Sequence, residues 1–151
     1  MQRKMHEVLR KFAYVACATL VAIAGCSHPP DETRIRNAIA AMRESAEVRN
    51  ASGVLDHVGN DFIGQKGDID RAGLARILKV EFLRKDGIDV SIGSIAIEVS
   101  GERATARFDM TVGDASRRWL PTGRETFAVV SGWRREGSEW VCYNATWDEK
   151  D

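Results

Sequence analysis

The pattern of hydrophobic and polar residues divides the chain into an uncharged apolar stretch, then helices, then strands. The first predicted helix starts near Pro30 and runs for about twenty residues, because apolar residues return at the spacing of one helix face. Asp31 and Glu32 suit its first turn, where the helix dipole favours negative charge. The residues of the apolar face are Ile35, Ala38, Ile39, Met42 and Ala46.

A shorter helix is expected next. Asn50–Gly53 interrupts the first helix, and Val54, Leu55 and Val58 mark a short helix that ends near Gly59.

A third helix is expected between a turn at residues 64–67 and the Asp86-Gly87 pair, which is a plausible C-terminal signal. Asp68 or Asp70 can cap its start. Its apolar positions are Leu74, Ile77, Leu78 and Phe82.

From residue 88 onward, alternating residues are hydrophobic, which predicts strands. The expected strands are 88–99, bent at Gly93, then 103–112, 124–134 and 139–147, with turns at 100–102 and 136–138. Three helices followed by a four-strand meander predict an α+β domain, with the helices packed on one face of a curved antiparallel sheet.

The last strands also carry most of the tryptophans. Trp133 and Trp140 are expected to form a cross-strand pair around the turn at 136–138. On the final strand, Tyr143 and Trp147 are expected to share one face, opposite to Cys142. Such aromatic residues either fill a core or line a ligand pocket.

Residues 1–25 form a predicted export signal. Residues 12–25 carry no charge; this stretch is shorter than the roughly 17–25 residues of a membrane-spanning helix and suits a signal-peptide core. The cations that precede it, against Glu7 alone, are Arg3, Lys4, Arg10 and Lys11.

The segment Val21-Ala-Ile-Ala-Gly-Cys26 resembles the lipobox of bacterial lipoproteins. The resemblance implies that the Cys26 thiol is acylated and that the chain is cut before it, so that a membrane holds the protein by its N-terminal lipid. Ser27 after the cysteine implies export to the outer membrane, with the domain facing the periplasm. Residues 26–31 are then a short tether, in which the stretch from Cys26 to Pro30 spans at most about 18 Å.

Charge and cysteine content narrow the function further. The whole chain has 22 Lys and Arg residues and 22 Asp and Glu residues. The predicted signal contains four of these basic residues and one of these acidic residues. The remaining chain therefore has 18 basic and 21 acidic residues, a net charge of −3. Nucleic acid is therefore disfavoured as a partner. The mature domain keeps Cys142 alone, without a local histidine, so a buried structural thiol is expected rather than a nucleophile.

Residues 32–148 resemble the nuclear transport factor 2-like superfamily, which includes ketosteroid-isomerase-like and SnoaL-like proteins. The resemblance lies in the helix pair up to His57-Val-Gly-Asn-Asp-Phe62, the third helix, the run Ile95-Ala-Ile-Glu-Val-Ser-Gly-Glu-Arg-Ala-Thr-Ala, and the pattern of residues 127–147. It implies a cone-shaped, cystatin-like fold, a pocket between the helices and the concave sheet face, and a capacity for pairing through the outer face. It carries no catalytic signature and speaks for the fold more than for function.

Several residues are candidates for that pocket. His57 and Asp61 stand four residues apart and can form a His–carboxylate pair, or they are simply exposed or capping residues. Glu81 lies on the apolar stripe of the third helix, where it is either a pocket acid or the partner of Arg84 or Lys85. Asp109 lies on the polar face of the predicted strand 103–112. It is a pocket residue if that face is the concave face of the sheet, and it forms a cross-strand ion pair if that face is solvated. Tyr143 and Trp147 complete the set of candidates.

The sequence lacks the residue patterns of a zinc site, a phosphate-binding loop and a nucleophile elbow. The mature chain retains two histidines and one free cysteine, so no metal site of the zinc type is expected, and no phosphate loop or nucleophile elbow indicates a cofactor.

The sequence therefore favours a lipid-anchored periplasmic domain, without catalytic activity, that binds a small apolar ligand or a protein partner. The alternatives are an isomerase- or dehydratase-type enzyme that uses a pocket acid, and a component of an envelope complex, including a toxin-immunity protein. A homodimer is possible in each case.

Overall fold

The computed structural model describes residues 29–115 and 123–150. The signal at residues 1–25 and the proposed lipid site Cys26 lie outside the described residues. In chain order the elements are α2 (Asp31–Glu47), α3 (Ala51–Leu55), β1 (Val58–Gly64), the 3-10 turn η1 (Gln65–Gly67), β2 (Ile69–Asp70), α4 (Arg71–Arg84), β3 (Ile88–Ile92), β4 (Ala96–Ser100), β5 (Arg103–Asp114), β6 (Glu125–Glu136) and β7 (Glu139–Glu149).

Helix α2 forms as the spacing predicts. Pro30 precedes it, and Asp31 and Glu32 lie in its first turn, close to the positive end of the helix dipole. It buries Ile35, Ala38 and Ile39, which belong to its predicted apolar face.

The second helix differs from its prediction. Asn50 does not only interrupt the chain; its side chain accepts a hydrogen bond from the Gly53 backbone N–H at 3.0 Å, so α3 starts at Ala51 and ends at Leu55. Val58 and Gly59 therefore lie in strand β1 and not in a helix. The prediction was wrong there because a few apolar residues over so short a stretch fit a short helix and a short strand equally well.

Helix α4 starts where Asp70 caps it. The Asp70 side chain accepts a hydrogen bond from the Gly73 N–H at 2.6 Å. The helix then ends at Arg84, two residues before the predicted Asp86-Gly87 stop.

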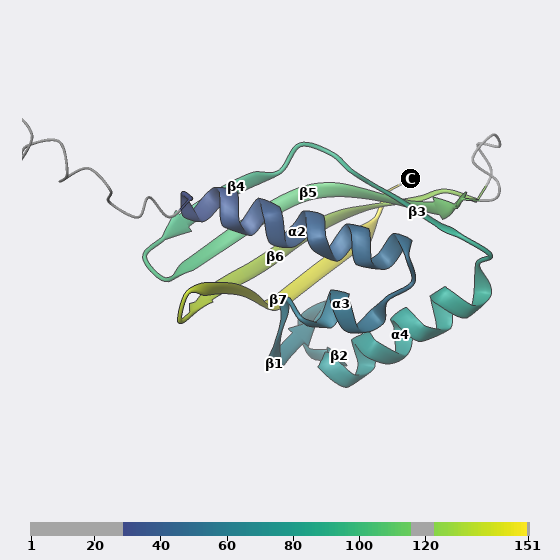
Figure 1. The fold of residues 1–151 in the computed structure, drawn as a ribbon, viewed down its shortest axis with the longest axis horizontal. Coiled ribbons are helices and arrows are strands. Elements are labelled where there is room, and N and C mark those ends of the chain that lie inside the picture. Colours follow the sequence, from purple (N-terminus) through teal and green to yellow (C-terminus); the bar gives the residue numbers. More distant parts are fainter. Residues whose placement is uncertain (1–28, 116–122, 151) are drawn as a thin grey trace, which may run out of the picture.

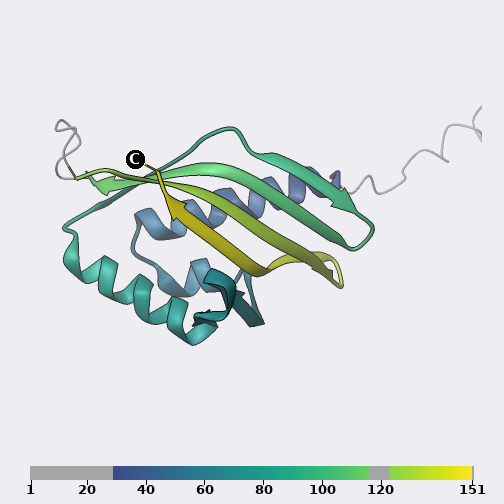
Figure 2. The same ribbon diagram turned by 180° about the vertical axis from the view of Figure 1, so that it is seen from behind.

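The described residues form one seven-stranded sheet, in the order β2-β1-β7-β6-β5-β3, with β4 also paired to β5. All three α-helices lie against the same face of this curved sheet, called the inner face here (Figure 1). Seen from behind, the opposite or outer face is uncovered (Figure 2). The α+β class and the curved sheet under the helices are confirmed.

The sheet is mixed, which the sequence did not predict. β1 pairs with β7 in parallel, with Val58 opposite Cys142 and Ile63 opposite Asn144. The Cys142 N–H donates to the His57 carbonyl at 2.9 Å. This pairing joins segments more than 80 residues apart, so no local pattern in the chain could indicate it.

The predicted strand 88–99 is two strands. β3 pairs with β5 with Ile92 opposite Met110, whereas β4 pairs with Ala96 opposite Arg107. The register therefore shifts by one residue across 93–95, and the inward-facing positions change from even to odd numbers. Gly93 keeps its N–H bonded to the Asp109 carbonyl at 2.9 Å through the break.

A second shift occurs in β7. Gly132 lies opposite Asn144 but Trp133 lies opposite Cys142, so Tyr143 is an extra, bulged residue. Between this bulge and the turn, Trp133 lies opposite Cys142 and Trp140 lies opposite Arg135, so the predicted cross-strand pair of the two tryptophans was wrong. Trp147 packs against the same core cluster as Cys142, so the predicted face shared by Tyr143 and Trp147 was wrong.

Two groups of buried side chains lie between the helices and the inner face. The larger surrounds Trp133, which is 1% exposed, and the smaller joins Phe82 of α4 to β3. The larger group is Ile35, Ala38, Ile39, Val58, Phe62, Ala104, Ala106, Trp133, Trp140 and Cys142. Among the described helices, none is long and apolar enough to cross a membrane.

Asp31 fastens the start of α2 to the β6–β7 hairpin. One carboxylate oxygen accepts a hydrogen bond from the Trp140 indole N–H at 3.0 Å, and the other accepts one from Arg135. The Arg135 guanidinium also lies over the Trp140 ring, 5.3 Å from its centroid. The start of α2 is thus held by a carboxylate, a guanidinium and an aromatic ring.

Replacing Asp31 tests this contact. Asp31→Ala leaves the Trp140 and Arg135 donors without their acceptor in a half-buried position, so we expect the free energy of unfolding to fall by about 1–3 kcal/mol. The matched control is Glu32→Ala, which removes an exposed acid from the same first helical turn. Urea unfolding of both variants measures the difference; equal losses would show that the helix dipole, and not the hydrogen bonds, matters.

Candidate functional site

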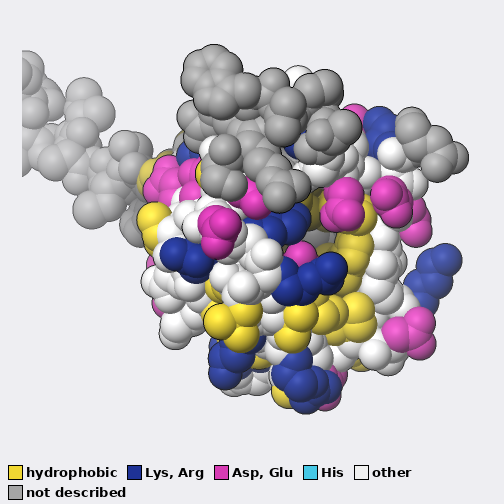
Figure 3. Space-filling model, turned by 90° about the vertical axis from the view of Figure 1, so that its right-hand side faces the viewer, with side chains coloured by type: hydrophobic (Ala, Val, Ile, Leu, Met, Phe, Trp, Pro, Cys, Tyr) yellow, Lys and Arg dark blue, Asp and Glu magenta, His cyan; other side chains and the backbone are white. Residues whose placement is uncertain are grey.

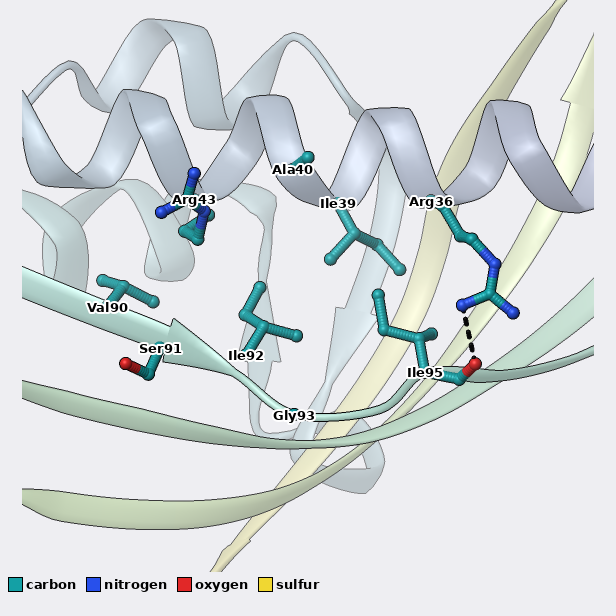
Figure 4. Close-up of a pocket in the computed structure, with 9 residues that line it drawn as sticks. All are labelled: Arg36, Ile39, Ala40, Arg43, Val90, Ser91, Ile92, Gly93 and Ile95. Atoms are coloured by element: carbon teal, nitrogen blue, oxygen red, sulfur yellow. Dashed lines mark hydrogen bonds between the residues drawn. The ribbon is translucent and has the colours of Figure 1, made fainter.

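A groove runs between α2 and the edge of the sheet formed by β3 and β4, with a volume of about 360 Å³ (Figure 4). On the α2 side it is lined by four residues of one helix face, and on the sheet side by the end of β3 and the break that follows. These residues are Arg36, Ile39, Ala40 and Arg43 from α2, and Val90, Ser91, Ile92, Gly93 and Ile95 from the sheet edge.

Local sequence explains why the groove exists. α2 buries Ile35, Ala38 and Ile39, so the neighbouring helix face, with Arg36 and Ala40, lies along the border of the core. On the other side, the one-residue shift after Ile92 takes the chain out of the β5 ladder until Ala96. The groove is therefore the seam between a helix and an interrupted edge strand.

The floor of the groove is apolar. The side chains of Ile39, Ile92 and Ile95 point toward one another across it, and Ala40 leaves room above them (Figure 4). An apolar floor of this size suits part of a small molecule, since ligand sites typically have about 300–1,000 Å³ and few polar groups.

The two arginines of the groove differ in their partners. Arg43 bonds Glu47 at 3.2 Å and lies 3.5 Å from Glu44, so its charge is compensated. Arg36 donates to the Ile95 carbonyl at 2.8 Å, and no carboxylate of the described residues lies within ion-pair distance of it. One end of the groove thus offers an uncompensated cation beside an apolar floor.

A second hollow of about 500 Å³ lies beside the start of α2 and the β6–β7 turn. Its cations, Arg34 and Arg135, share Asp31, which lies 3.8 Å from Arg34. No aliphatic Ile, Leu or Val side chain of the described residues lines this hollow, so it suits a ligand with an apolar body less well than the α2 groove does.

The structure separates the residues that the sequence nominated. Asp61 extends from β1 and bonds both terminal nitrogens of Arg134 at 2.7 Å, not His57, which precedes β1. Glu81 of α4 pairs with Arg84 at 3.2 Å and Lys85 at 3.9 Å.

The strand residues of the set lie on opposite faces. Asp109 is on the outer face and pairs with Lys150 at 2.7 Å. Tyr143 lies there too, beneath the guanidiniums of Arg103 and Arg134, 5.2 and 5.8 Å from its ring centroid. Trp147 instead lies half-buried on the inner face, against the core. Asp61 and Tyr143 both contact Arg134 on the outer face, whereas Glu81, Asp109 and Trp147 each have other partners.

The Arg134 contact shifts the ionisation of Asp61. The hydrogen bonds from Arg134 hold the pKa of the Asp61 carboxyl below its usual value, and the same pair, with Glu136, raises the pKa of Arg134. A carboxylate held ionised in this way fastens β1 to β6 across β7, which is a structural role.

The interior under the helices is filled by side chains. Ser131 is the buried polar residue of the described core, and it bonds the Ala106 carbonyl and accepts from the Trp133 indole. Burial raises the pKa of the Cys142 thiol to about 12, so this sulfur is protonated at neutral pH. Within residues 29–115 and 123–150, no three His, Cys, Asp or Glu side chains are placed to hold a metal ion.

The groove is lined by residues that were not among those predicted from the sequence to form a pocket. Its α2 half has a readable signal, because Arg36, Ile39, Ala40 and Arg43 follow the i, i+3, i+4, i+7 spacing of one helix face. Its sheet half has none, because the break at 93–95 becomes a groove wall only when α2 lies beside it.

Comparisons with known proteins place the fold. No family model matches the chain, and no curated protein matches it. Among solved structures, it is similar to a cystatin-like-fold protein from Nostoc punctiforme, with 15% identity, 82% of this chain and 93% of that chain covered, and a TM-score of 0.67. A nuclear transport factor 2-like protein from Pseudomonas putida gives 15% identity, 78% and 84% coverage, and a TM-score of 0.68.

A third solved structure is described as a putative aromatic ring hydroxylase, from Novosphingobium aromaticivorans. It shares 16% identity, covers 82% of this chain and 93% of its own, and has a TM-score of 0.65. At such identities the likeness shows the fold alone. The domain has the nuclear transport factor 2-like, cystatin-like fold.

The Asp61–Arg134 pair gives a pH-dependent prediction. The Asp61 pKa is lowered in the folded state, so the pair stabilises the fold above the unfolded carboxyl pKa of about 4 and ceases to do so as the pH falls through the lower folded value. We expect Asp61→Asn to be less stable than the parent at neutral pH, and the gap to close on acidification below about pH 4.

Urea unfolding of the parent and Asp61→Asn across this pH range measures the gap. Asp68→Asn is the control, because Asp68 is an exposed acid without an ion pair among the described residues. A gap for Asp61→Asn that stays constant with pH would mean that shape, and not charge, accounts for it.

Proposed function

We propose that the protein is a lipid-anchored periplasmic binding protein without catalytic activity, whose ligand is a small apolar molecule with one anionic group. The observation that carries the proposal is the groove beside α2, where Arg36 has no carboxylate partner among the described residues and lies beside an apolar floor. The separation of the nominated acids and the protonated Cys142 thiol support binding rather than catalysis.

Arg36 gives the groove its chemical preference. Its guanidinium lies at one end, where it can exchange part of its contact with the Ile95 carbonyl for a carboxylate, a stronger and charge-assisted acceptor. At the other end Arg43 is compensated by Glu47 and Glu44. A ligand with one anionic end and an apolar body matches this arrangement better than a dianion or a neutral molecule.

The ligand prediction is tested with 4-phenylbutyrate and its neutral counterpart 4-phenylbutanol. We expect the acid to shift the methyl NMR signals of Ile39, Ile92 and Ile95, and to bind more tightly than the alcohol. Arg36→Gln should weaken binding of the acid about fivefold and leave the alcohol unchanged, because an exposed ion pair contributes on the order of 1 kcal/mol. Ala40→Trp should remove binding of both by filling the groove.

The matched control is Arg107→Gln, an exposed arginine on the outer face of the sheet. If binding of the acid is unchanged by Arg36→Gln but lost in Ala40→Trp, the groove is still the binding site, but its preference for an anionic group is excluded. Methyl shifts elsewhere in the core, with none in the groove, would contradict the site.

Anchoring is a separate prediction. Two or more acyl chains hold a protein on a membrane stably, whereas one does not. We expect the chain to be recovered with outer membranes and to incorporate labelled palmitate, and Cys26→Ser to lose the label and the lipid-dependent attachment. Cys142→Ser is the control for labelling elsewhere; label that persists in Cys26→Ser would contradict acylation at this residue.

The outer face of the sheet bears on the proposed partners. Ion pairs cross it, with Arg107 bonded to Glu98 at 3.1 Å and Asp109 bonded to Lys150. Val130, which is 42% exposed, lies among these polar residues. A mostly charged face favours a small ligand over a homodimer formed through this face.

A further inference from the structure

Helix α4 carries apolar residues on two faces. Leu74, Leu78 and Phe82 pack toward the core, whereas Ile77, Val80 and Leu83 are exposed, Leu83 by 88%. A surface helix of a globular domain normally buries one apolar stripe and presents polar residues to water. The second apolar stripe of α4 therefore needs an explanation.

The exposed half of α4 also carries cations and no acid. At 100° per residue, Arg76, Lys79 and Arg84 fall among Ile77, Val80 and Leu83, while Glu81 falls on the opposite half with Leu74 and Leu78. Glu81 pairs with Arg84 and Lys85. No carboxylate of the described residues lies within ion-pair distance of Arg76 or Lys79. We call this half of α4, with its six residues, the basic-apolar face.

The end of α2 extends this surface. Val48 is 74% exposed, and Arg49 donates to the Lys85 carbonyl at 3.5 Å, which brings a further aliphatic and a further cation beside the C-terminal end of α4. In the lower part of Figure 3, where α4 lies, hydrophobic side chains are bordered by those of Lys and Arg. Aliphatic residues interleaved with cations are the composition of helices that lie on anionic lipid surfaces.

We propose that the basic-apolar face of α4 rests on an anionic phospholipid surface. The inference rests on the proposed anchoring, because the stretch from Cys26 to Pro30 would then hold the start of α2 within about 18 Å of the bilayer. Cations contact lipid phosphates at such a surface, and Val80 and Leu83 enter the headgroup region. Figure 1 draws the start of α2 and helix α4 toward opposite ends of the long axis but against the same face of the sheet, so a membrane that lies along that face would meet both.

Position-specific fluorescence quenching by lipid tests the contact. The lipidated chain, purified from membranes and reconstituted, carries one environment-sensitive label at Leu83→Cys or, as matched control, at Val130→Cys on the outer face of the sheet. The buried thiol of Cys142 reacts poorly, and the parent chain gives the labelling background. Vesicles contain a lipid-borne quencher and consist either of phosphatidylcholine alone or of phosphatidylcholine with phosphatidylglycerol.

We expect quenching several-fold stronger at position 83 than at position 130 in the vesicles with phosphatidylglycerol, and a smaller difference in phosphatidylcholine. Reversing two charges, Arg76→Glu with Lys79→Glu, should bring position 83 close to the level of position 130. Circular dichroism of that variant, compared with the parent, shows whether α4 remains folded; Val80→Ser offers a milder variant with the same expected direction.

Sedimentation of the vesicles separates this inference from the anchoring. If the chain sediments with the vesicles but both positions are quenched equally, the anchoring stands and the proposed contact of α4 with lipid is overturned. A chain that does not sediment overturns both. Self-quenching between labels at position 83, without quenching by lipid, would identify a second copy as the occupant and overturn the lipid surface.

Discussion

The packing of α2 on the inner face of the sheet determines the rest of the domain. α2 approaches strands whose facing residues alternate in size, since Ala104 lies opposite Trp133 and Ala106 lies opposite Ser131. Ile35, the two alanines and Trp133 belong to one buried cluster, in which small side chains offset the volume of the indole. This packing fixes where the helix lies on the sheet. The contacts of Asp31 at its start and of Arg43 near its end depend on that position.

The same packing creates the site at its border. A helix that lies across a twisted sheet can follow the sheet only over part of its length, so its flank meets the edge strand in a seam. Here the edge strand also shifts register between Ile92 and Ala96, which opens the seam beside Arg36. The arginine then bonds a backbone carbonyl of the break, an acceptor that the ladder leaves free. The core is therefore closed beneath the middle of α2, and the groove lies at the border of the core.

The sequence patterns predicted those structural features that depend on residues close together in the chain. The face of α2, the alternation of β5 and the turn at 100–102 follow from local spacing, so the α+β class and the covered sheet could be predicted. The two register shifts could not, because the extra residue is recognised only against the partner strand. Tyr143 and Trp147 have the right parity to share a face, and the bulge at Tyr143 separates them. Asp61 likewise appeared next to His57 in the chain, while its partner Arg134 lies 73 residues away.

The distribution of charge matters more than its sum for the orientation of the domain. The chain without residues 1–25 carries a net charge of −3, which by itself would oppose the approach to an anionic surface. Salt limits that repulsion to about 8–10 Å, so a membrane interacts mainly with the face nearest to it. The exposed half of α4 presents Arg76 and Lys79 without a paired acid, while Asp109 and Glu98 lie on the opposite side of the sheet. On that opposite side Arg107 pairs with Glu98 and Lys150 pairs with Asp109, so their charges are compensated. The attraction to an anionic membrane therefore comes from the α4 side, and the distribution of charge favours one orientation under the proposed tether.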